Sequence, residues 1–270
     1  MFFENLMFLR KNESIKYMSQ GKIMIYIGHQ ENGCCKSDKM KCVRIKKRMS
    51  EISIVLASNS PRRKQILSWA GISFTVRPAD INETPLPNET PEEYVQRLAA
   101  SKARKVSGSA GFKDLILAAD TTVADAKEIL GKPANNEEAR LMLEKLRGRV
   151  HFVHTAVAVY APAFGRMEEE LCTTRVRMRR YTDEEIDLYI KTGDPTDKAG
   201  AYGIQNVEFH PVDQLKGCFA SVMGLPLCHV ERILRRMGYG ERTNVPYICQ
   251  DQLAYNCPIF QRVLKGEDIG

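Results

Sequence analysis

The sequence predicts an α/β domain in which a mixed sheet is flanked by helices and two lobes surround a central cleft. Three observations support this fold class. From Ile52 onward, segments with strand and helix patterns alternate along the chain. Residues 150–161 and 171–181 alternate apolar and polar side chains, which is typical of paired strands with one exposed face. No linker or low-complexity segment follows Ser50, so we expect one domain.

The helices are predicted from their end signals. Pro61 and Gly71 frame one helix, with proline in its first turn and glycine just past its end. Thr90 and Thr182 each open a capping box with a glutamate three residues later. The expected helices span 61–70, 91–106, 135–146, 182–191 and 225–237. The expected strands span 52–58, 73–79, 114–120, 150–161 and 171–181, and the third is expected to end at Asp120.

The net charge of +7 is concentrated at one end of the chain. Residues 1–48 hold eleven of the 40 basic and four of the 33 acidic residues, so the remainder is neutral. A neutral body argues against a nucleic-acid-binding surface. We therefore expect three parts: a disordered N-terminal extension at 1–49, a folded domain at 50–239 and a C-terminal extension at 240–270.

The compartment expected from the sequence is the cytoplasm. No run reaches the roughly 18 apolar residues of a membrane span, and the first residues lack the pattern of a secretory signal. The eight cysteines form no CxxC pair, so free thiols are expected. The extension with Cys249 and Cys257 is expected to pack on the body or on a second subunit, which leaves a homodimer open.

The stretch "SNSPRR", residues 58–63, combines hydroxyls and cations at a helix start. Unpaired backbone N–H groups and the helix dipole favour an anion there. Ser58 adds a hydroxyl, and Arg62 and Arg63 add planar guanidinium groups that suit phosphate oxygens. The alternative is a capped surface helix with solvated arginines, and this stretch alone does not decide between them.

Two acidic residues are candidate metal ligands. Asp120 follows the apolar stretch "ILAA" at the expected carboxyl edge of a sheet, where open α/β folds bind their ligands. Glu83 lies in the polar loop "INETP". Their oxygens would suit Mg²⁺ or Mn²⁺ together with phosphate and water. The alternatives are a turn residue for Asp120 and a solvated loop charge for Glu83.

Further polar residues lie in loops that glycines interrupt. Lys132 stands in "GKP", and residues 193–205 read "GDPTDKAGAYGIQ" and end at Gln205. Such loops bring backbone close to a ligand.

Taken together, these motifs resemble the Maf family of nucleotide pyrophosphatases, also described as septum formation inhibitors. The motifs "SNSPRR", "INET", "RLAASKA", "AADTTV", "LGKP", "DKAGAYGIQ" and "VMGLPL" occur in the family's order. The resemblance covers about residues 52–238. It implies a Maf/ITPase-like fold with a nucleotide-binding cleft, and hydrolysis of a nucleoside triphosphate between its α and β phosphates.

Within the family, "ADT" and "YGIQ" resemble the subgroup that acts on dTTP and UTP. The resemblance implies that Asp120 accepts the proton of the attacking water and holds a divalent metal together with Glu83. The implied contacts to the substrate are Ser58, Arg62, Arg63, Lys102, Thr121, Lys132 and Gln205, of which Arg62, Thr121 and Gln205 are linked to base choice. This chain departs from the family after Gln205, where "NVEFHP" replaces the usual glycines.

The resemblance leaves alternatives in substrate and activity. The same reaction could act on another base, such as 7-methyl-GTP or CTP. The protein could instead be a nucleotide-binding regulator of septum formation that does not catalyse the reaction. The expected role is nucleotide-pool housekeeping, including modified pyrimidine nucleotides, with an open link to cell-division arrest. We expect no membrane partner and no nucleic-acid partner.

Overall fold

The structure is a computed structural model of the chain, and it describes residues 14–19, 22–27, 53–111, 113–239 and 244–270. The chain divides into two units, residues 1–50 and residues 51–270. In the first unit, the strands β1 (Ser14–Ser19) and β2 (Lys22–Ile27) pair antiparallel. The rest of the N-terminal extension lies outside the described residues, so its expected disorder stays a prediction.

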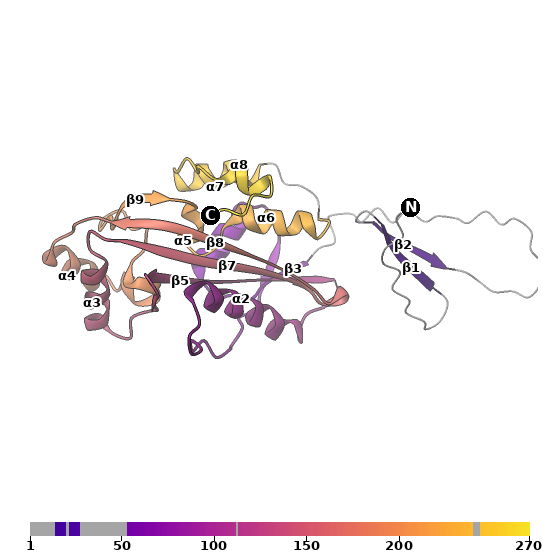
Figure 1. Ribbon diagram of the computed structural model, residues 1–270, viewed down its shortest axis with the longest axis horizontal. Coiled ribbons are helices and arrows are strands. Elements are labelled where there is room, and N and C mark those ends of the chain that lie inside the picture. The colour runs from indigo at the N-terminus through magenta and orange to yellow at the C-terminus, as the bar shows by residue number, and fades with distance from the viewer. Residues whose placement is uncertain (1–13, 20–21, 28–52, 112, 240–243) are drawn as a thin grey trace, which may run out of the picture. The chain divides into compact units, whose positions relative to one another are not determined.

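The second unit is built on a mixed sheet, as the sequence predicts (Figure 1). Within the described residues the strand order is β4-β3-β5-β7-β8-β9, with β6 paired to β5. The strands are β3 (Ser53–Leu56), β4 (Phe74–Val76), β5 (Asp114–Asp125), β6 (Glu128–Leu130), β7 (Val150–Ala161), β8 (Arg166–Met178) and β9 (Val212–Lys216). The strand β3 runs parallel to β4 and β5, whereas the pairs from β5 to β9 are antiparallel.

The helices cover both faces of this sheet. They are α1 (Pro61–Trp69), α2 (Pro91–Ser107), α3 (Asn136–Leu146), α4 (Asp183–Lys191), α5 (Phe219–Val222), α6 (Leu227–Arg236), α7 (Val245–Leu253) and α8 (Phe260–Leu264). Figure 1 shows α2 on one side of the sheet and α6, α7 and α8 on the other. Both predicted capping boxes, at Thr90 and Thr182, are confirmed.

One face of the sheet carries two separate apolar cores. Side chains two residues apart on a strand share a face. On β5, Ala119 belongs to a core built with α1 and α6, and Val123 belongs to a core built with α3 and α4. Thr121 lies between them, beside its β7 partner Thr155. This polar pair interrupts the apolar face between the two cores, and Ile204 packs against both of them.

The prediction that a strand ends at Asp120 is wrong. The strand β5 continues to Asp125, because residues 121–124 go on pairing with β7 as far as Phe152. The run Thr121 to Ala124 consists of residues that fit a half-buried strand, so Asp120 is a mid-strand residue rather than a turn residue.

The C-terminal extension packs on the body of the unit. Val245 belongs to the same core as α1 and α6, and Cys249 and Leu253 pack against that core. Arg232 of α6 donates a hydrogen bond of 3.2 Å to the carbonyl of Val263. The first of the two arrangements expected for this extension is therefore present. Among the described residues, no helix has the length and apolar character needed to cross a membrane.

Candidate active site

The candidate site lies where β5 continues beyond the end of β3, the strand parallel to it. The strand β3 ends at Leu56, opposite Leu117, and the amide of Ala57 donates the last hydrogen bond to the Leu117 carbonyl at 2.8 Å. Asp120 and Thr121 lie farther along β5, beyond this end. Their side-chain partners come from three other elements: Lys102 of α2 contacts Asp120, and Arg63 of α1 and Thr155 of β7 contact Thr121.

Arg63 is fixed by three hydrogen bonds in a group that we call the arginine cluster: Ser58, Arg63, Thr121 and Gly224. Its Nη1 donates to Ser58 Oγ at 3.1 Å, its Nη2 to Thr121 Oγ1 at 3.2 Å and its Nε to the Gly224 carbonyl at 2.9 Å. A Cβ atom at Gly224 would lie 3.2 Å from Nε, and φ there is +111°. Glycine is therefore needed for this approach.

Thr121 connects the arginine cluster to the strand β7 and the helix α5. Its Oγ1 lies 2.9 Å from Thr155 Oγ1, and Thr155 donates to the Ser221 carbonyl at 2.8 Å. Thr155 and Ser221 are fully buried. The guanidinium of Arg63 therefore belongs to a continuous, partly buried hydrogen-bond network, which restricts its orientation.

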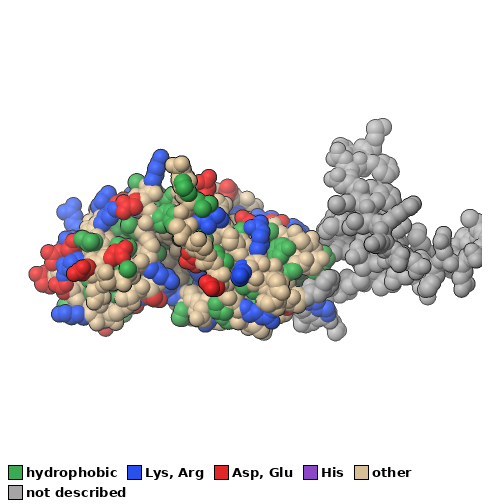
Figure 2. All heavy atoms as spheres, turned by 90° about the horizontal axis from the view of Figure 1, so that it is seen from below, with side chains coloured by type: hydrophobic (Ala, Val, Ile, Leu, Met, Phe, Trp, Pro, Cys, Tyr) green, Lys and Arg blue, Asp and Glu red, His purple; other side chains and the backbone are tan. Residues whose placement is uncertain are grey.

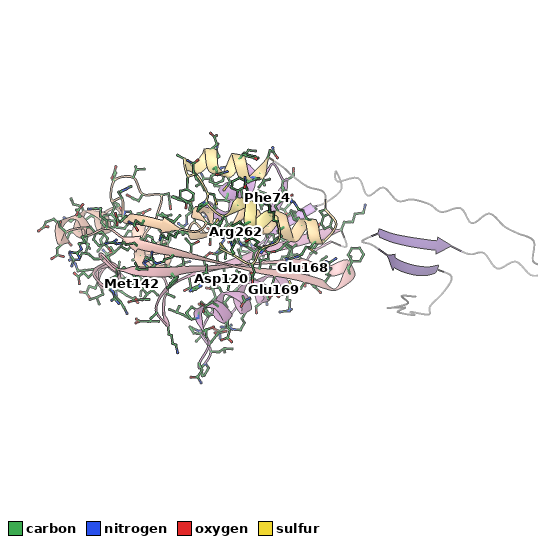
Figure 3. The ribbon with its side chains drawn as sticks, turned by 45° about the horizontal axis from the view of Figure 1, so that its top comes forward. Phe74, Asp120, Met142, Glu168, Glu169 and Arg262 are labelled. Carbon is green, nitrogen blue, oxygen red and sulfur yellow. The ribbon has the colours of Figure 1, made fainter. Side chains whose placement is uncertain are left out.

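A second group, which we call the carboxylate cluster, consists of Glu83, Lys102 and Asp120. Lys102 Nζ lies 2.5 Å from Asp120 Oδ1 and 2.7 Å from Glu83 Oε1. The side chains of Lys102 and Asp120 are each 9% exposed, whereas that of Glu83 is 52% exposed. The hydroxyl of Tyr94 donates to the Glu83 carbonyl at 2.9 Å, so α2 also holds the loop that carries Glu83. Figure 3 shows Asp120 midway along the sheet, between Met142 and Glu168.

The pKa of Asp120 is raised above its usual value. Burial is the largest cause, because it disfavours the ionised carboxylate. The positive charges of Lys102 and Arg63 act in the opposite direction without cancelling this effect. A carboxylate held this way can accept a proton more readily than a solvated aspartate.

The carboxylate cluster has free oxygens that suit a divalent cation. Lys102 engages Oδ1 of Asp120 and Oε1 of Glu83, and no described hydrogen bond engages Oδ2 or Oε2. Two converging carboxylates with an oxygen each to spare are a donor set that Mg²⁺ or Mn²⁺ accepts when phosphate and water complete the shell. The residues at this position therefore fit the predicted metal.

Arg62 points to a different part of the chain from Arg63. Its Nη1 forms an ion pair with Asp197 Oδ2 at 3.1 Å. The other oxygen of Asp197 lies 2.6 Å from Lys198 Nζ, and Lys198 also contacts Asp194 Oδ1 at 2.9 Å. We call residues 193–206, which carry these groups, the acidic loop.

Two predicted site residues, Lys132 and Gln205, are exposed. Lys132 follows Gly131, whose carbonyl accepts a hydrogen bond from Gly200 of the acidic loop at 3.0 Å. Gln205 lines an open hollow together with Thr192, Asp194 and other residues of the same segment. Among the described residues, no hydrogen bond or ion pair joins either side chain to another predicted site residue.

The structure thus places seven of the nine predicted site residues in three groups: the arginine cluster, the carboxylate cluster and the Arg62–Asp197 ion pair. The arginine and carboxylate clusters are linked through the backbone, since Thr121 and Asp120 are consecutive residues of β5. The sequence did not identify Asp194, Asp197 and Lys198 as site residues. The signal was present, because "DPTDK" places three charges between glycines in a loop already singled out. Buried Lys198, 7% exposed, is the residue this signal could have found.

These features define an α/β protein in which two neighbouring residues of β5, Asp120 and Thr121, carry the carboxylate cluster and the arginine cluster beyond the end of β3. The family described as "Maf-like protein" matches residues 53–237. The chain belongs to this family.

Two relatives that are named for an activity match about 70% of the chain. The dTTP/UTP pyrophosphatase of Citrifermentans bemidjiense is 47% identical over 190 residues, which is 70% of this chain and 98% of that protein. The protein of the same name from Anaeromyxobacter dehalogenans strain 2CP-1 is 46% identical over 69% of this chain and 94% of that protein.

A solved structure, the nucleoside-triphosphatase/dITP/XTP pyrophosphatase of Mycobacterium abscessus, is 17% identical and covers 47% of this chain and 73% of that chain, with a TM-score of 0.32. A TM-score of this size supports no conclusion about this chain.

Proposed function

We propose that this protein hydrolyses dTTP and UTP to the nucleoside monophosphate and pyrophosphate, as a nucleotide-pool housekeeping enzyme. The observation that carries the proposal is Asp120, a buried carboxylate beside Lys102 and Arg63 in a chain 46% and 47% identical to proteins named for this activity. Modified pyrimidine triphosphates that keep the same base edge belong to the same substrate class.

Asp120 is the proton acceptor in the proposed reaction. The oxygen of a water molecule forms a bond to the α-phosphorus, and the bond from that phosphorus to the bridging oxygen breaks. The water proton passes to Asp120, and the electron pair leaves with pyrophosphate. The raised pKa of Asp120, caused mainly by burial, suits this role.

The cations around Asp120 hold the triphosphate. Arg63 and Ser58 present donors whose directions are already fixed, and fixed donors stabilise developing charge without reorganising during the reaction. Lys102 and Lys132 add ammonium groups that contact phosphate oxygens as point charges. Lys102 already bridges Asp120 and Glu83, so its ammonium lies beside the carboxylates that take part in the proposed reaction.

Glu83 and Asp120 would hold a divalent cation, Mg²⁺ or Mn²⁺, through the oxygens that Lys102 leaves free. The ion would neutralise phosphate charge during the reaction. The base is chosen by Arg62, Thr121 and Gln205, of which Thr121 lies in the arginine cluster and Gln205 at the exposed end of the acidic loop.

The proposed enzyme works in the cytoplasm. The five cysteines among the described residues are free thiols: Cys172, Cys218, Cys228, Cys249 and Cys257. Reduced thiols are the normal state in the cytosol. Figure 2 shows Lys and Arg side chains interspersed with Asp and Glu on one face of the second unit, which agrees with a small-molecule substrate rather than a polyanion.

A pyrophosphate-release assay tests the proposal. The purified chain is supplied separately with dTTP, UTP, CTP and 7-methyl-GTP, each with Mg²⁺, with Mn²⁺ and with a chelator. We expect dTTP and UTP to give the highest kcat/KM, and the chelator to abolish release. Preference for CTP or 7-methyl-GTP would contradict the base assignment. Nucleotide binding without any release would instead favour the regulator of septum formation.

A further inference from the structure

The first turn of α1 lacks an acidic residue. Arg62, Arg63 and Lys64 follow Pro61 directly, and no acidic side chain lies in this turn. Cations near a helix N-terminus are disfavoured by the helix dipole and by one another. Arg63 donates to the uncharged groups of the arginine cluster, and Lys64 donates to the uncharged Asn59 side chain at 2.8 Å. Arg62 differs from both, because it forms an ion pair with a carboxylate from a distant part of the chain.

Asp197 supplies that carboxylate from a residue 135 positions away in the sequence. Among the described residues, it is the one acid within ion-pair distance of Arg62. Burial alone would raise the pKa of Asp197, but the hydrogen bond from Lys198 and the charge of Arg62 outweigh it and lower the pKa. Asp197 is therefore ionised at neutral pH and bridges two cations.

The acidic loop that carries Asp197 is anchored to the sheet. Gly200 has φ of +68°, and a Cβ atom there would lie 3.0 Å from the side chain of Val123 on β5. The amide of Gly200 donates to the Gly131 carbonyl at 3.0 Å. Val123 is two residues from Thr121 on the same strand. Asp197 thus holds Arg62 from a fixed position.

Hydrogen bonds to Asp194 hold together the two ends of the acidic loop. The Oδ2 atom of Asp194 accepts hydrogen bonds from Tyr189 at 2.7 Å and from the Asn206 side chain at 3.3 Å. The Tyr189 hydroxyl in turn accepts from the Gly203 amide at 2.9 Å. Asn206 follows Gln205 directly. The segment before and after Gln205 is therefore tied to Asp194.

These contacts form one path between two residues of the proposed base selection. It runs from Arg62 through Asp197 and Lys198 to Asp194, and from Asp194 to the residues that flank Gln205. The arrangement makes the position of the Arg62 guanidinium depend on the loop that carries Gln205.

We propose that Asp197 is a positioning residue for base selection, which holds the Arg62 guanidinium at a fixed place relative to Gln205. The inference rests on the proposed function, because it concerns how that reaction distinguishes its bases. Asp197 itself does not touch the reacting atoms. Its side chain is 55% exposed, so its contribution lies in orientation rather than in stability.

The test compares kcat/KM for dTTP with kcat/KM for CTP in four proteins: wild type, Asp197→Asn, Arg62→Ala and the double variant. We expect Asp197→Asn to lower the dTTP/CTP ratio by about tenfold, a typical size for one lost discriminating contact. The double variant should lower it no further than Arg62→Ala alone, because both changes remove the same interaction.

Two further variants separate positioning from a structural role. Asp197→Glu keeps the charge and should restore most of the ratio that Asp197→Asn loses. Asp213→Asn removes a comparable acid, whose side chain is 48% exposed and pairs with Arg177 on the strand β8 at 3.5 Å. This control should keep the wild-type ratio.

Two results would overturn the inference, and they differ. If Arg62→Ala lowers the ratio but Asp197→Asn does not, Asp197 does not position Arg62 while the base role of Arg62 survives. If Arg62→Ala itself keeps the wild-type ratio, the base role assigned to Arg62 fails and the inference fails with it. If the wild-type protein does not hydrolyse dTTP, the proposed function is refuted instead.

Discussion

The pairs Lys102–Asp120 and Arg62–Asp197 both join a cation to a carboxylate at the candidate site, but they differ in burial. Both side chains of the first pair are 9% exposed, whereas those of the second are 23% and 55% exposed. A buried charge that loses its partner is costly, while an exposed pair is screened by water and contributes little. The comparison teaches that the same kind of contact has a large energetic effect when it is buried and a small one when it is exposed.

The largest expected effect is on turnover at the buried pair. Asp120→Asn keeps the size of the side chain but removes the proton acceptor, so kcat for dTTP should fall about 10²- to 10⁴-fold. Pyrophosphate release measures kcat, and calorimetric titration of dTTP checks that binding persists. Asp125→Asn, at the far end of β5 beside Arg149, is the control. Turnover within a few fold of wild type in Asp120→Asn would exclude Asp120 as the base.

The second prediction concerns folding stability at the same pair. Lys102→Met leaves Asp120 buried without its ammonium partner, which should lower the free energy of unfolding by about 3 kcal/mol at neutral pH. The loss should shrink at acid pH, since protonation of Asp120 removes the unpaired charge. Urea unfolding at two pH values measures both effects. Lys105→Met, an exposed change on the same helix, should have little effect, and an equal loss in both variants would contradict the argument.

The third prediction gives the direction of a pH shift. Asp120 accepts a proton only when ionised, so kcat/KM falls as the pH falls through its pKa. Burial raises that pKa and the charge of Lys102 opposes the rise. In Lys102→Met the acid limb of the kcat/KM profile should therefore move to higher pH. A limb that stays in place, or moves to lower pH, would show that another group controls it.

The two pairs also differ in how far the sequence predicted them. The motifs placed Lys102, Asp120 and Glu83 in one site, and the structure brings them together. Local patterns also predicted the helix caps, because a cap depends on residues three apart. The sequence could not show that Asp120 is a mid-strand residue, since the continuation of β5 depends on pairing with β7.

Long-range contacts explain what the sequence missed. Asp197 meets Arg62 across 135 residues, and the Gly224 carbonyl meets Arg63 across 161. Both partners lie in quoted motifs, "DKAGAYGIQ" and "VMGLPL", but a motif does not show which distant residue each of its members contacts. Gln205 was predicted with the other site residues, yet it is exposed and contacts none of them among the described residues. The sequence therefore predicted the contacts of the carboxylate cluster better than those of Arg62 and Gln205, the two residues proposed to select the base.

The smallest expected effect is on stability at the exposed pair. Asp197→Asn should lower the free energy of unfolding by less than about 1 kcal/mol, because solvent screens the Arg62 ion pair and Lys198 keeps its contacts to Asp194. Urea unfolding beside Lys102→Met measures the difference. Asp194→Asn should cost more than Asp197→Asn, since Asp194 accepts hydrogen bonds from Tyr189, Lys198 and Asn206. If Asp197→Asn instead destabilised the protein as much as Lys102→Met, exposure would not separate the two pairs. A changed base ratio in that variant would then reflect a damaged loop rather than a misplaced guanidinium.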